Sequence, residues 1–398
     1  MKYYLIAGEA SGDLHGANLM RGLKKADPGA EFRFWGGDRM AEQGGAGALA
    51  RHYNTASFFG LLNVALHIRT IARQMRECRE DVLAFAPDVL ILVDYPGFNL
   101  RMARFARERG IRTFYYISPK VWAWKEGRVK KIRRYVDRLF IIFPFEAEYF
   151  RSRGVEAVFE GNPIVDALSE EMAAMPSREE FLRANALSSK PVVALLAGSR
   201  SQEIRHNLPF MAELAERFAD YQFVVAGVDW LPRELYDRHN VRVVFGQTYP
   251  LLRYAEAAVV ASGTATLEAA LIGTPEFVCY RVDGFSMMIA RLFLKIRYVS
   301  LVNIIMGREV VRELLQEQMS RANADAELRA ILPGGARREA MLADFDRLRR
   351  LVGGPGASDR FAAKMVSLMA RSRQRDVLPD SHETGAAGPC EAENTISE

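Results

Sequence analysis

Short apolar runs alternate with helix-forming segments along most of this 398-residue chain. The N-terminal half repeats the alternation about six times, and the pattern returns between Val192 and Tyr280. Strand–helix–strand repeats favour a parallel sheet with helices on both faces. The segment between the two series, 169–190, is polar and helical and lacks a strand. The sequence therefore predicts an α/β protein with two doubly wound, Rossmann-like domains that face each other across a cleft.

The same pattern gives the expected domain boundaries, because 398 residues are too many for one ordinary core. We expect a first domain at 1–168, a linker at 169–190 and a second domain at 191–350. The rest of the second half, including Arg308–Gln316, reads as helical. A C-terminal helix is expected at 351–373, with packing back on the first domain as one option. The acidic, Gly-, Ala- and Ser-rich residues 374–398 are typical of disorder.

Charge and cysteine content limit the classes of function. A net charge of +5 suits an anionic ligand, an anionic membrane face or nucleic acid. No nucleic-acid-binding motif accompanies it, so we expect no nucleic acid partner. Three widely spaced cysteines predict a reducing compartment, without a disulfide framework or a zinc pattern. We therefore expect a cytoplasmic protein.

Two turns in the second half have the form of a phosphate cradle. Val259–Pro275 and Val192–Arg200 each contain a buried strand and a turn of small residues, and a helix follows each turn. Free N–H groups at a helix start favour phosphate oxygens, and the Glu268 carboxylate can accept hydrogen bonds from a ribose diol. Either turn alone is equally compatible with ordinary α/β packing, but the pair favours a site. The expected donor-binding residues are Gly198, Ser199, Arg200, Ser262, Gly263, Thr264 and Glu268, with Gln247 at another strand end.

A carboxylate is expected at the sheet edge of the first domain. Strand Val89–Val93 delivers Asp94 to the carboxyl end, where open α/β sheets bind ligands. Asp94 is therefore a candidate general base, although capping the next helix or bonding loop amides suits its position equally well. In the turn Gly8–Asp13, Asp13 is expected to cap the helix that bears Leu14.

Two segments indicate contact with lipid. Lys125–Arg134 predicts a strongly basic helix beside Trp122 and Trp124. Such a run is usually only a solvated face, but the tryptophans suit a phosphate-bearing amphiphile or a membrane surface. Residues 56–68 are unusually apolar, which fits a buried helix or a lipid-facing one.

The motifs that the chain lacks narrow the chemistry. It has neither the G-x-G-x-x-G of dinucleotide binding nor a P-loop, and no G-x-S-x-G elbow. The Asp344–Asp346 pair is interpreted as a solvated helix face, so we expect no metal and no cofactor. The remaining pattern indicates group transfer between two ligands, with Arg200 and helix N-termini stabilising the leaving group.

Five segments resemble the lipid-A-disaccharide synthase family, from about residue 2 to about residue 350. They are Ala7–Gly16, Ile117–Ile132, Leu195–Ile204, Ala261–Pro275 and Tyr298–Glu317. The resemblance implies inverting glycosyltransferases with the two-domain GT-B fold. It also implies a reaction in which UDP-2,3-diacylglucosamine and 2,3-diacylglucosamine 1-phosphate (lipid X) give a β-1,6-linked disaccharide and UDP.

The resemblance also extends the set of site residues. It also implies that the protein attaches peripherally to the cytoplasmic face of the inner membrane. A homodimer stays among the alternatives for its oligomeric state. On the donor side the resemblance adds Asn303, Arg308 and Glu309. The acceptor- or membrane-side residues are Ser11, Phe58, Phe59, Leu62, Trp122, Trp124, Lys125, Arg128 and Lys131.

The chain departs from the family pattern at two positions. Gly97 stands where the family often has the second Asp of Asp-x-Pro-Asp-Phe-Asn, so Asp94 is the first choice of base, followed by Asp13 and His15. Asn162 replaces a common histidine. Two alternatives stay open. One is another GT-B enzyme on a UDP-sugar, such as a UDP-N-acetylglucosamine epimerase or another lipid-linked transferase. The other is a basic membrane-associated module that binds anions without catalysis.

Overall fold

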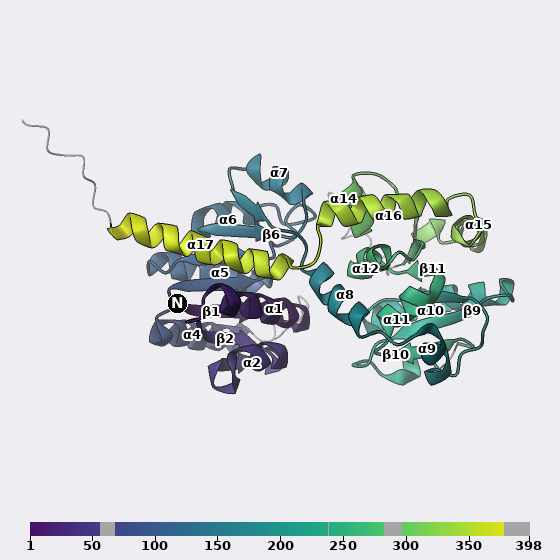
Figure 1. Cartoon of the computed structure of the whole chain (residues 1–398), viewed down its shortest axis with the longest axis horizontal. Coiled ribbons are helices and arrows are strands. Elements are labelled where there is room, and N and C mark those ends of the chain that lie inside the picture. Colours follow the sequence, from purple (N-terminus) through teal and green to yellow (C-terminus); the bar gives the residue numbers. More distant parts are fainter. Residues whose placement is uncertain (56–67, 238, 282–296, 378–398) are drawn as a thin grey trace, which may run out of the picture.

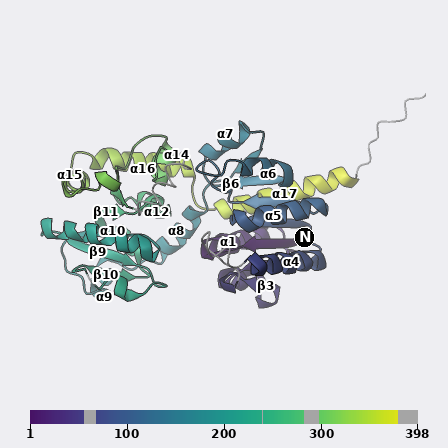
Figure 2. The same cartoon turned by 180° about the vertical axis from the view of Figure 1, so that it is seen from behind.

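The computed structural model describes residues 1–55, 68–237, 239–281 and 297–377, which form two α/β domains side by side (Figures 1 and 2). The first sheet has the order β3-β2-β1-β4-β5-β6-β7, and all its strands are parallel. The strands are β1 (Lys2–Ala7), β2 (Glu31–Gly36), β3 (Leu49–His52), β4 (Val89–Val93), β5 (Thr113–Tyr116), β6 (Arg138–Ile141) and β7 (Ala157–Phe159). The order reverses between β1 and β4, which makes their carboxyl ends the expected ligand site.

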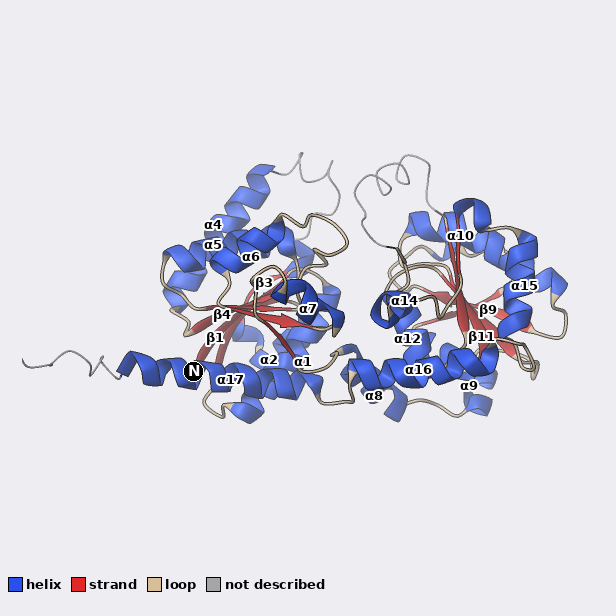
Figure 3. Ribbon diagram, turned by 90° about the horizontal axis from the view of Figure 1, so that it is seen from above, coloured by secondary structure: helices blue, strands red, loops and turns tan. Residues whose placement is uncertain are grey.

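Helices cover both faces of this sheet (Figure 3). Continuous apolar runs such as β4 are fully buried between them, as parallel sheets require. The helices are α1 (Ala10–Ala26), α2 (Asp38–Gly44), α4 (Ile68–Phe85), α5 (Pro96–Glu108), α6 (Arg128–Tyr135) and α7 (Phe145–Arg151).

The second sheet is also parallel, with the order β10-β9-β8-β11-β12-β13. Its strands are β8 (Val192–Leu196), β9 (Gln222–Gly227), β10 (Arg242–Phe245), β11 (Ala255–Val260), β12 (Glu276–Tyr280) and β13 (Glu313–Leu315). The switch point lies between β8 and β11, the strands that precede the two cradle turns. The remaining α-helices of the described chain, of which the last packs on the first domain, are α8 (Ile164–Ala173), α9 (Arg178–Ala184), α10 (Ser201–Glu213), α11 (Thr248–Tyr254), α12 (Thr264–Ile272), α14 (Leu301–Met306), α15 (Arg321–Ile331), α16 (Arg338–Val352) and α17 (Ala357–Val377).

The prediction of a two-domain parallel α/β fold is confirmed, although individual elements differ from it. Arg308–Gln316 was expected to be helical, but Glu313–Leu315 forms the edge strand β13 beside β12. The Glu313 carboxylate accepts the backbone N–H groups of Val299 and Ser300. These contacts, remote in sequence, override the helical pattern of the charged residues.

The chain crosses between the domains twice, and the crossings are bonded to each other. The Asn162 N–H donates to the Val352 carbonyl. The Asp166 carboxylate accepts N–H groups at the start of α17, from Gly356 at 2.6 Å and Ser358 at 2.8 Å. α17 then packs along α1 of the first domain (Figure 1). Its residues Phe361, Met365 and Met369 join the core with Leu19, Met20 and Leu23.

No helix in the described part of the chain combines the length and apolarity that crossing a bilayer requires.

Glu276 at the start of β12 is fully buried, and neither carboxylate oxygen has a hydrogen-bond partner within the described residues. Burial raises its pKa well above the usual range. We expect Glu276→Met to raise the free energy of unfolding by about 1–3 kcal/mol, because it removes an unsatisfied buried polar group. Urea unfolding measures this difference, and the exposed Glu317→Met is the control.

The pH dependence gives this prediction a second measurement. Folded Glu276 keeps its proton at pH values where the unfolded chain releases it, so increasing pH favours unfolding. The gain from Glu276→Met should therefore be larger at pH 8 than at pH 5. An unchanged or lower stability would show that the carboxyl group is satisfied.

Candidate active site

Asp94 follows β4 in a strained backbone conformation. Both Asp94 (φ 42°) and the next residue, Tyr95 (φ 46°), are left-handed, which is rare for residues other than glycine. The Asp94 carbonyl accepts hydrogen bonds from the Tyr115 hydroxyl at 2.5 Å and the Asn99 amide at 2.8 Å. Gly8 makes room for Tyr95, since a Cβ there would lie 2.3 Å from its ring. Three neighbouring elements thus hold the Asp94 backbone in place.

The surroundings of Asp94 raise the pKa of its carboxyl group to about 6, first through burial and then through the negative charge of Glu9. Lys120 and Arg128 oppose this rise. A carboxylate with a pKa near 6 is ionised at neutral pH and still accepts a proton readily. The side chain does not cap α5, whose N-cap residue is Tyr95.

The other two base candidates are occupied or remote. The Asp13 carboxylate is buried and accepts the N–H groups of Gly37 (2.6 Å), Arg39 (3.1 Å) and Met40 (3.2 Å). It therefore caps α2. The expectation that it caps its own helix is wrong, because α1 begins at Ala10, before Asp13.

His15 is half-buried, and its Nδ1 is shielded from solvent without a hydrogen-bond partner in the described structure. Burial lowers the pKa of its imidazole to about 4, opposed by the charge of Asp166 at the domain crossing. At neutral pH the ring is uncharged, and it lies near the crossing between the domains. Three backbone N–H groups already bond Asp13, and His15 lies beside the crossing between the domains, so Asp94 remains the first choice of base.

The acceptor-side residues gather on the segment between β5 and α6. Trp124 is 44% exposed, and two cations lie over its ring: Lys125 at 4.3 Å and Arg128 at 5.4 Å. Lys131 is exposed on α6. Trp122 is half-buried and donates its indole N–H to Glu146. This surface is therefore basic and aromatic.

The other residues predicted for the acceptor side are Ser11, Phe58, Phe59 and Leu62. Ser11 is exposed and donates its hydroxyl to Glu9 at 2.7 Å. Phe58, Phe59 and Leu62 lie outside the described residues.

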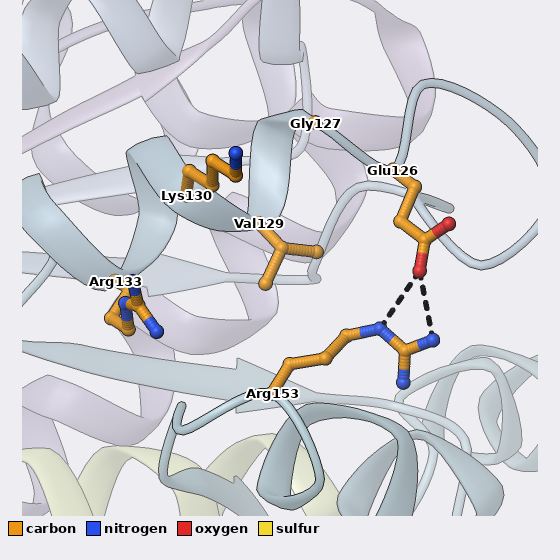
Figure 4. Close-up of a pocket in the computed structure, with 6 residues that line it drawn as sticks. All are labelled: Glu126, Gly127, Val129, Lys130, Arg133 and Arg153. Carbon is orange, nitrogen blue, oxygen red and sulfur yellow. Dashed lines mark hydrogen bonds and ion pairs between the residues drawn. The ribbon is translucent and has the colours of Figure 1, made fainter.

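A hollow of about 400 Å³ opens beside this surface, between α6 and the end of α7 (Figure 4). Its wall contains Val129, Lys130 and Arg133. Arg153 donates two hydrogen bonds to one oxygen of Glu126, at 3.0 and 2.8 Å, and lies 3.8 Å from the ring of Tyr149. Arg153 is thus fixed in place, while Lys130 and Arg133 are exposed.

On the second domain, Gly198 and Ser199 form a tight turn before α10. Gly198 has φ 121°, and a Cβ there would lie 2.5 Å from the Glu203 side chain. The Ser199 N–H donates to Glu203 at 2.9 Å. Arg200 follows as the N-cap residue of α10, with its side chain 80% exposed and 3.7 Å from Glu203. Its guanidinium is accessible to an anionic ligand.

The second cradle turn is built in the same way. Gly263 has φ 123°, and the exposed Thr264 begins α12. The Ser262 hydroxyl donates to the Val299 carbonyl, so backbone N–H groups are what this turn offers a phosphate. Glu268, one turn into α12, accepts the Tyr249 hydroxyl at 2.9 Å through one oxygen. Burial raises the pKa of Glu268, and Tyr249 opposes the rise.

Four predicted donor-side residues are bonded within the domain. Gln247 exchanges hydrogen bonds with Asn185 of the linker. Asn303 is fully buried and bonds Val310, Val311 and Glu313, so its side chain has a structural role instead of the expected ligand role. Arg308 pairs with Asp344 of α16. Glu309 pairs with Arg312 beside a separate hollow of about 420 Å³ that α15 lines.

Several residues of this region were not predicted. Tyr249, Lys120, Glu9 and Glu146 each contact or influence a candidate residue. Arg39 of the first domain acts electrostatically on Tyr249 of the second: burial raises the Tyr249 pKa, and the positive charge of Arg39 opposes this. No three His, Cys, Asp or Glu side chains among the described residues are grouped to hold a metal ion.

Solved structures share this fold at low sequence identity. The UDP-GlcNAc 2-epimerase from Neisseria meningitidis bound to UDP-GlcNAc matches with a TM-score of 0.60 and 14% identity, covering 94% of this chain and 100% of that chain. A UGT transferase from Siraitia grosvenorii in complex with UDP matches with a TM-score of 0.59 and 15% identity, covering 93% and 99%. These similarities establish the two-domain GT-B fold alone.

Sequence similarity is closer and covers nearly the whole chain. A family model described as lipid-A-disaccharide synthetase matches residues 3–353. The lipid-A-disaccharide synthase of Syntrophus aciditrophicus is 39% identical over 380 residues, covering 92% of this chain and 98% of that protein. The corresponding protein of Myxococcus xanthus is 38% identical over 379 residues, covering 93% and 98%. The chain therefore belongs to the lipid-A-disaccharide synthase family of glycosyltransferases.

Proposed function

We propose that this chain transfers 2,3-diacylglucosamine from UDP-2,3-diacylglucosamine to 2,3-diacylglucosamine 1-phosphate. The products are a β-1,6-linked disaccharide 1-phosphate and UDP. One observation carries the proposal beyond family membership. The first domain holds a carboxylate with a pKa near 6 at a strand end, and the second domain holds an anion cradle at two helix starts. That combination suits a reaction that removes a proton from one ligand and releases a diphosphate from the other.

The roles of the residues follow from this chemistry. Asp94 removes the proton of the acceptor 6-hydroxyl as its oxygen bonds to the anomeric carbon. The bond from that carbon to the diphosphate oxygen breaks, and UDP leaves with the electron pair. Attack from the opposite face inverts the configuration. Arg200 and the N–H groups at the starts of α10 and α12 stabilise the charge on UDP.

Glu268 completes the donor site. One of its oxygens is taken by Tyr249, which leaves the other to accept a ribose hydroxyl. Leaving-group stabilisation by an arginine and helix starts requires no divalent ion, so turnover should continue in EDTA.

The experiment that tests this function measures UDP release in detergent with EDTA. The chain is offered UDP-2,3-diacylglucosamine alone, the same donor with lipid X, or UDP-N-acetylglucosamine with lipid X. Release that requires both acylated sugars supports the transfer. Consumption of UDP-N-acetylglucosamine alone, with no reaction of the acylated pair, would favour an epimerase instead.

We further propose that the chain works on the cytoplasmic face of the inner membrane and that α6 contacts anionic lipid there. Four exposed cations of α6, Lys130, Lys131, Arg133 and Arg134, have no ion-pair partner among the described residues. The exposed Trp124 ring, with Lys125 and Arg128 over it, lies on the segment that leads into α6. Exposed cations beside an aromatic ring favour the headgroup region of a negatively charged bilayer.

Neutralising two of these cations should weaken membrane binding. Each basic residue near an anionic surface contributes about 1 kcal/mol, so Lys131→Ala with Arg134→Ala should lower vesicle affinity by roughly thirtyfold. Co-sedimentation with phosphatidylglycerol-containing vesicles measures the change. The matched control removes two exposed cations of α16, Arg347→Ala with Arg350→Ala. Equal losses in both pairs would show that only the net charge matters.

A further inference from the structure

Glu146 is a buried carboxylate for which the transfer chemistry described above has no role. It lies in the first turn of α7, directly after the β6 strand end, and is only 1% exposed. One oxygen accepts the Ser118 hydroxyl at 2.7 Å and the Trp122 indole N–H at 3.0 Å. The other accepts the backbone N–H groups of Ile142 (3.3 Å) and Phe143 (3.1 Å). A single side chain thus joins two loops at the carboxyl edge of the sheet.

The loop that Glu146 holds is strained at both ends. Ile117, just before the loop, has φ 64°, and Lys125, just after it, has φ 54°, although neither is glycine. Such conformations persist only where neighbouring groups hold them. Trp122 also packs edge-on against Phe145, with ring centroids 5.0 Å apart. Glu146 therefore lies at the centre of the contacts that keep this loop in one conformation.

The same loop carries charges that act on the candidate base. Lys120 is within it and Arg128 follows it, and both oppose the rise in the pKa of Asp94. Trp124, the exposed ring of the acceptor surface, lies between them. Movement of this loop would therefore change acceptor contacts and Asp94 together, and it would leave the donor cradle of the second domain intact.

We propose that Glu146 is a positioning residue for the transfer reaction, whose carboxylate holds the Ser118–Trp124 loop so that Lys120 and Trp124 face the acceptor beside Asp94. The inference rests on the proposed function. It adds a residue that acts through the loop without touching either substrate.

The test is Glu146→Gln, which keeps the size of the side chain but replaces an acceptor oxygen by an amide donor. At least one of the four hydrogen bonds must then be lost, because the Trp122 indole N–H and the backbone N–H groups cannot accept from the amide. We expect the KM for lipid X to rise on the order of tenfold, because a buried hydrogen bond that holds the loop is lost. The KM for the UDP-sugar should stay unchanged. The acid limb of the pH profile, the range in which kcat/KM falls as the pH decreases, should move above pH 6. The reason is that Lys120 no longer lowers the Asp94 pKa.

The control is Glu148→Gln on the same helix, where the exposed Glu148 pairs with the exposed Arg151. It should change none of these quantities. Thermal unfolding checks that Glu146→Gln folds. If it does not, Ser118→Ala carries the test, since it removes one donor and keeps the carboxylate, and lipid X KM should rise by a smaller factor.

An unchanged lipid X KM and an unmoved acid limb in a folded variant would overturn the inference. An equal rise in both substrate KM values would also overturn it, because that is the result of general destabilisation. Failure of the proposed function looks different, since the unsubstituted chain would then release no UDP from the acylated pair.

Discussion

Replacing Asp94 by asparagine is expected to lower kcat by about 10²- to 10⁴-fold, the range that a positioned general base contributes. Asparagine keeps the size of the side chain and the hydrogen bonds of the residue 94 backbone to Tyr115 and Asn99. Binding of UDP to the second domain should therefore be unchanged. Initial rates of UDP release measure the loss, and calorimetric titration of UDP checks the donor site.

The pH dependence of kcat/KM tests the same prediction in a second way. A base must be ionised to act, so kcat/KM should rise with pH and level off above about 6, where burial and Glu9 place the Asp94 pKa. Glu9→Gln removes the negative charge that raises this pKa and should move the limb to lower pH. The residual kcat/KM of Asp94→Asn should not fall as the pH decreases through 6.

A nearly normal rate in Asp94→Asn would mean that another group takes the proton. Asp13 is a poor substitute because three backbone N–H groups already bond its carboxylate. His15 is also unsuited, because burial near the crossing between the domains lowers its pKa to about 4. Glu9 would then be the next carboxylate to replace, since its charge acts on Asp94 directly.

Much of the fold follows from local sequence. The apolar run at β4 matches the predicted strand Val89–Val93 residue for residue, because it is buried on both faces and ends at a turn. β13 was missed because it has three residues, begins with Glu313 and lies at a sheet edge. Its strand state depends on pairing with β12, which no local pattern encodes.

The candidate site was less predictable because side-chain roles depend on distant partners. Asp13 has the position of a cap for its own helix, but its partners are the N–H groups at 37–40. Asn303 lies in a motif-like segment, but it bonds the loop that precedes β13. Turn residues such as Gly198 and Gly263 were easier to predict, because backbone geometry alone requires glycine there.

The fold by itself does not distinguish a transferase from an epimerase. The UDP-GlcNAc 2-epimerase of Neisseria meningitidis shares it at 14% identity. What separates the two is the sequence match over residues 3–353 and the basic, aromatic surface around Trp124. Epimerisation within one UDP-sugar needs no second lipid-bearing substrate, so such a surface would have no purpose in it.

Replacing Arg200 by alanine should lower kcat by about 10²- to 10³-fold, the range measured when one donor to a developing negative charge is removed. Arg200 carries an exposed guanidinium at the start of α10, beside the Gly198 turn. Its charge matters most as the diphosphate leaves, so kcat should fall more than the affinity for the UDP-sugar. Single-turnover rates of UDP release and donor titrations separate the two effects.

Two variants sharpen the interpretation of that loss. Arg200→Lys keeps the charge but not the planar, two-pronged donor, so it should recover part of the rate. Arg205→Ala removes another exposed arginine from the same helix, one turn beyond the cradle, and should leave the rate nearly normal. If Arg200→Ala and Arg205→Ala lose activity equally, the effect is one of net charge. If neither does, the diphosphate must be held by groups other than these two guanidinium groups.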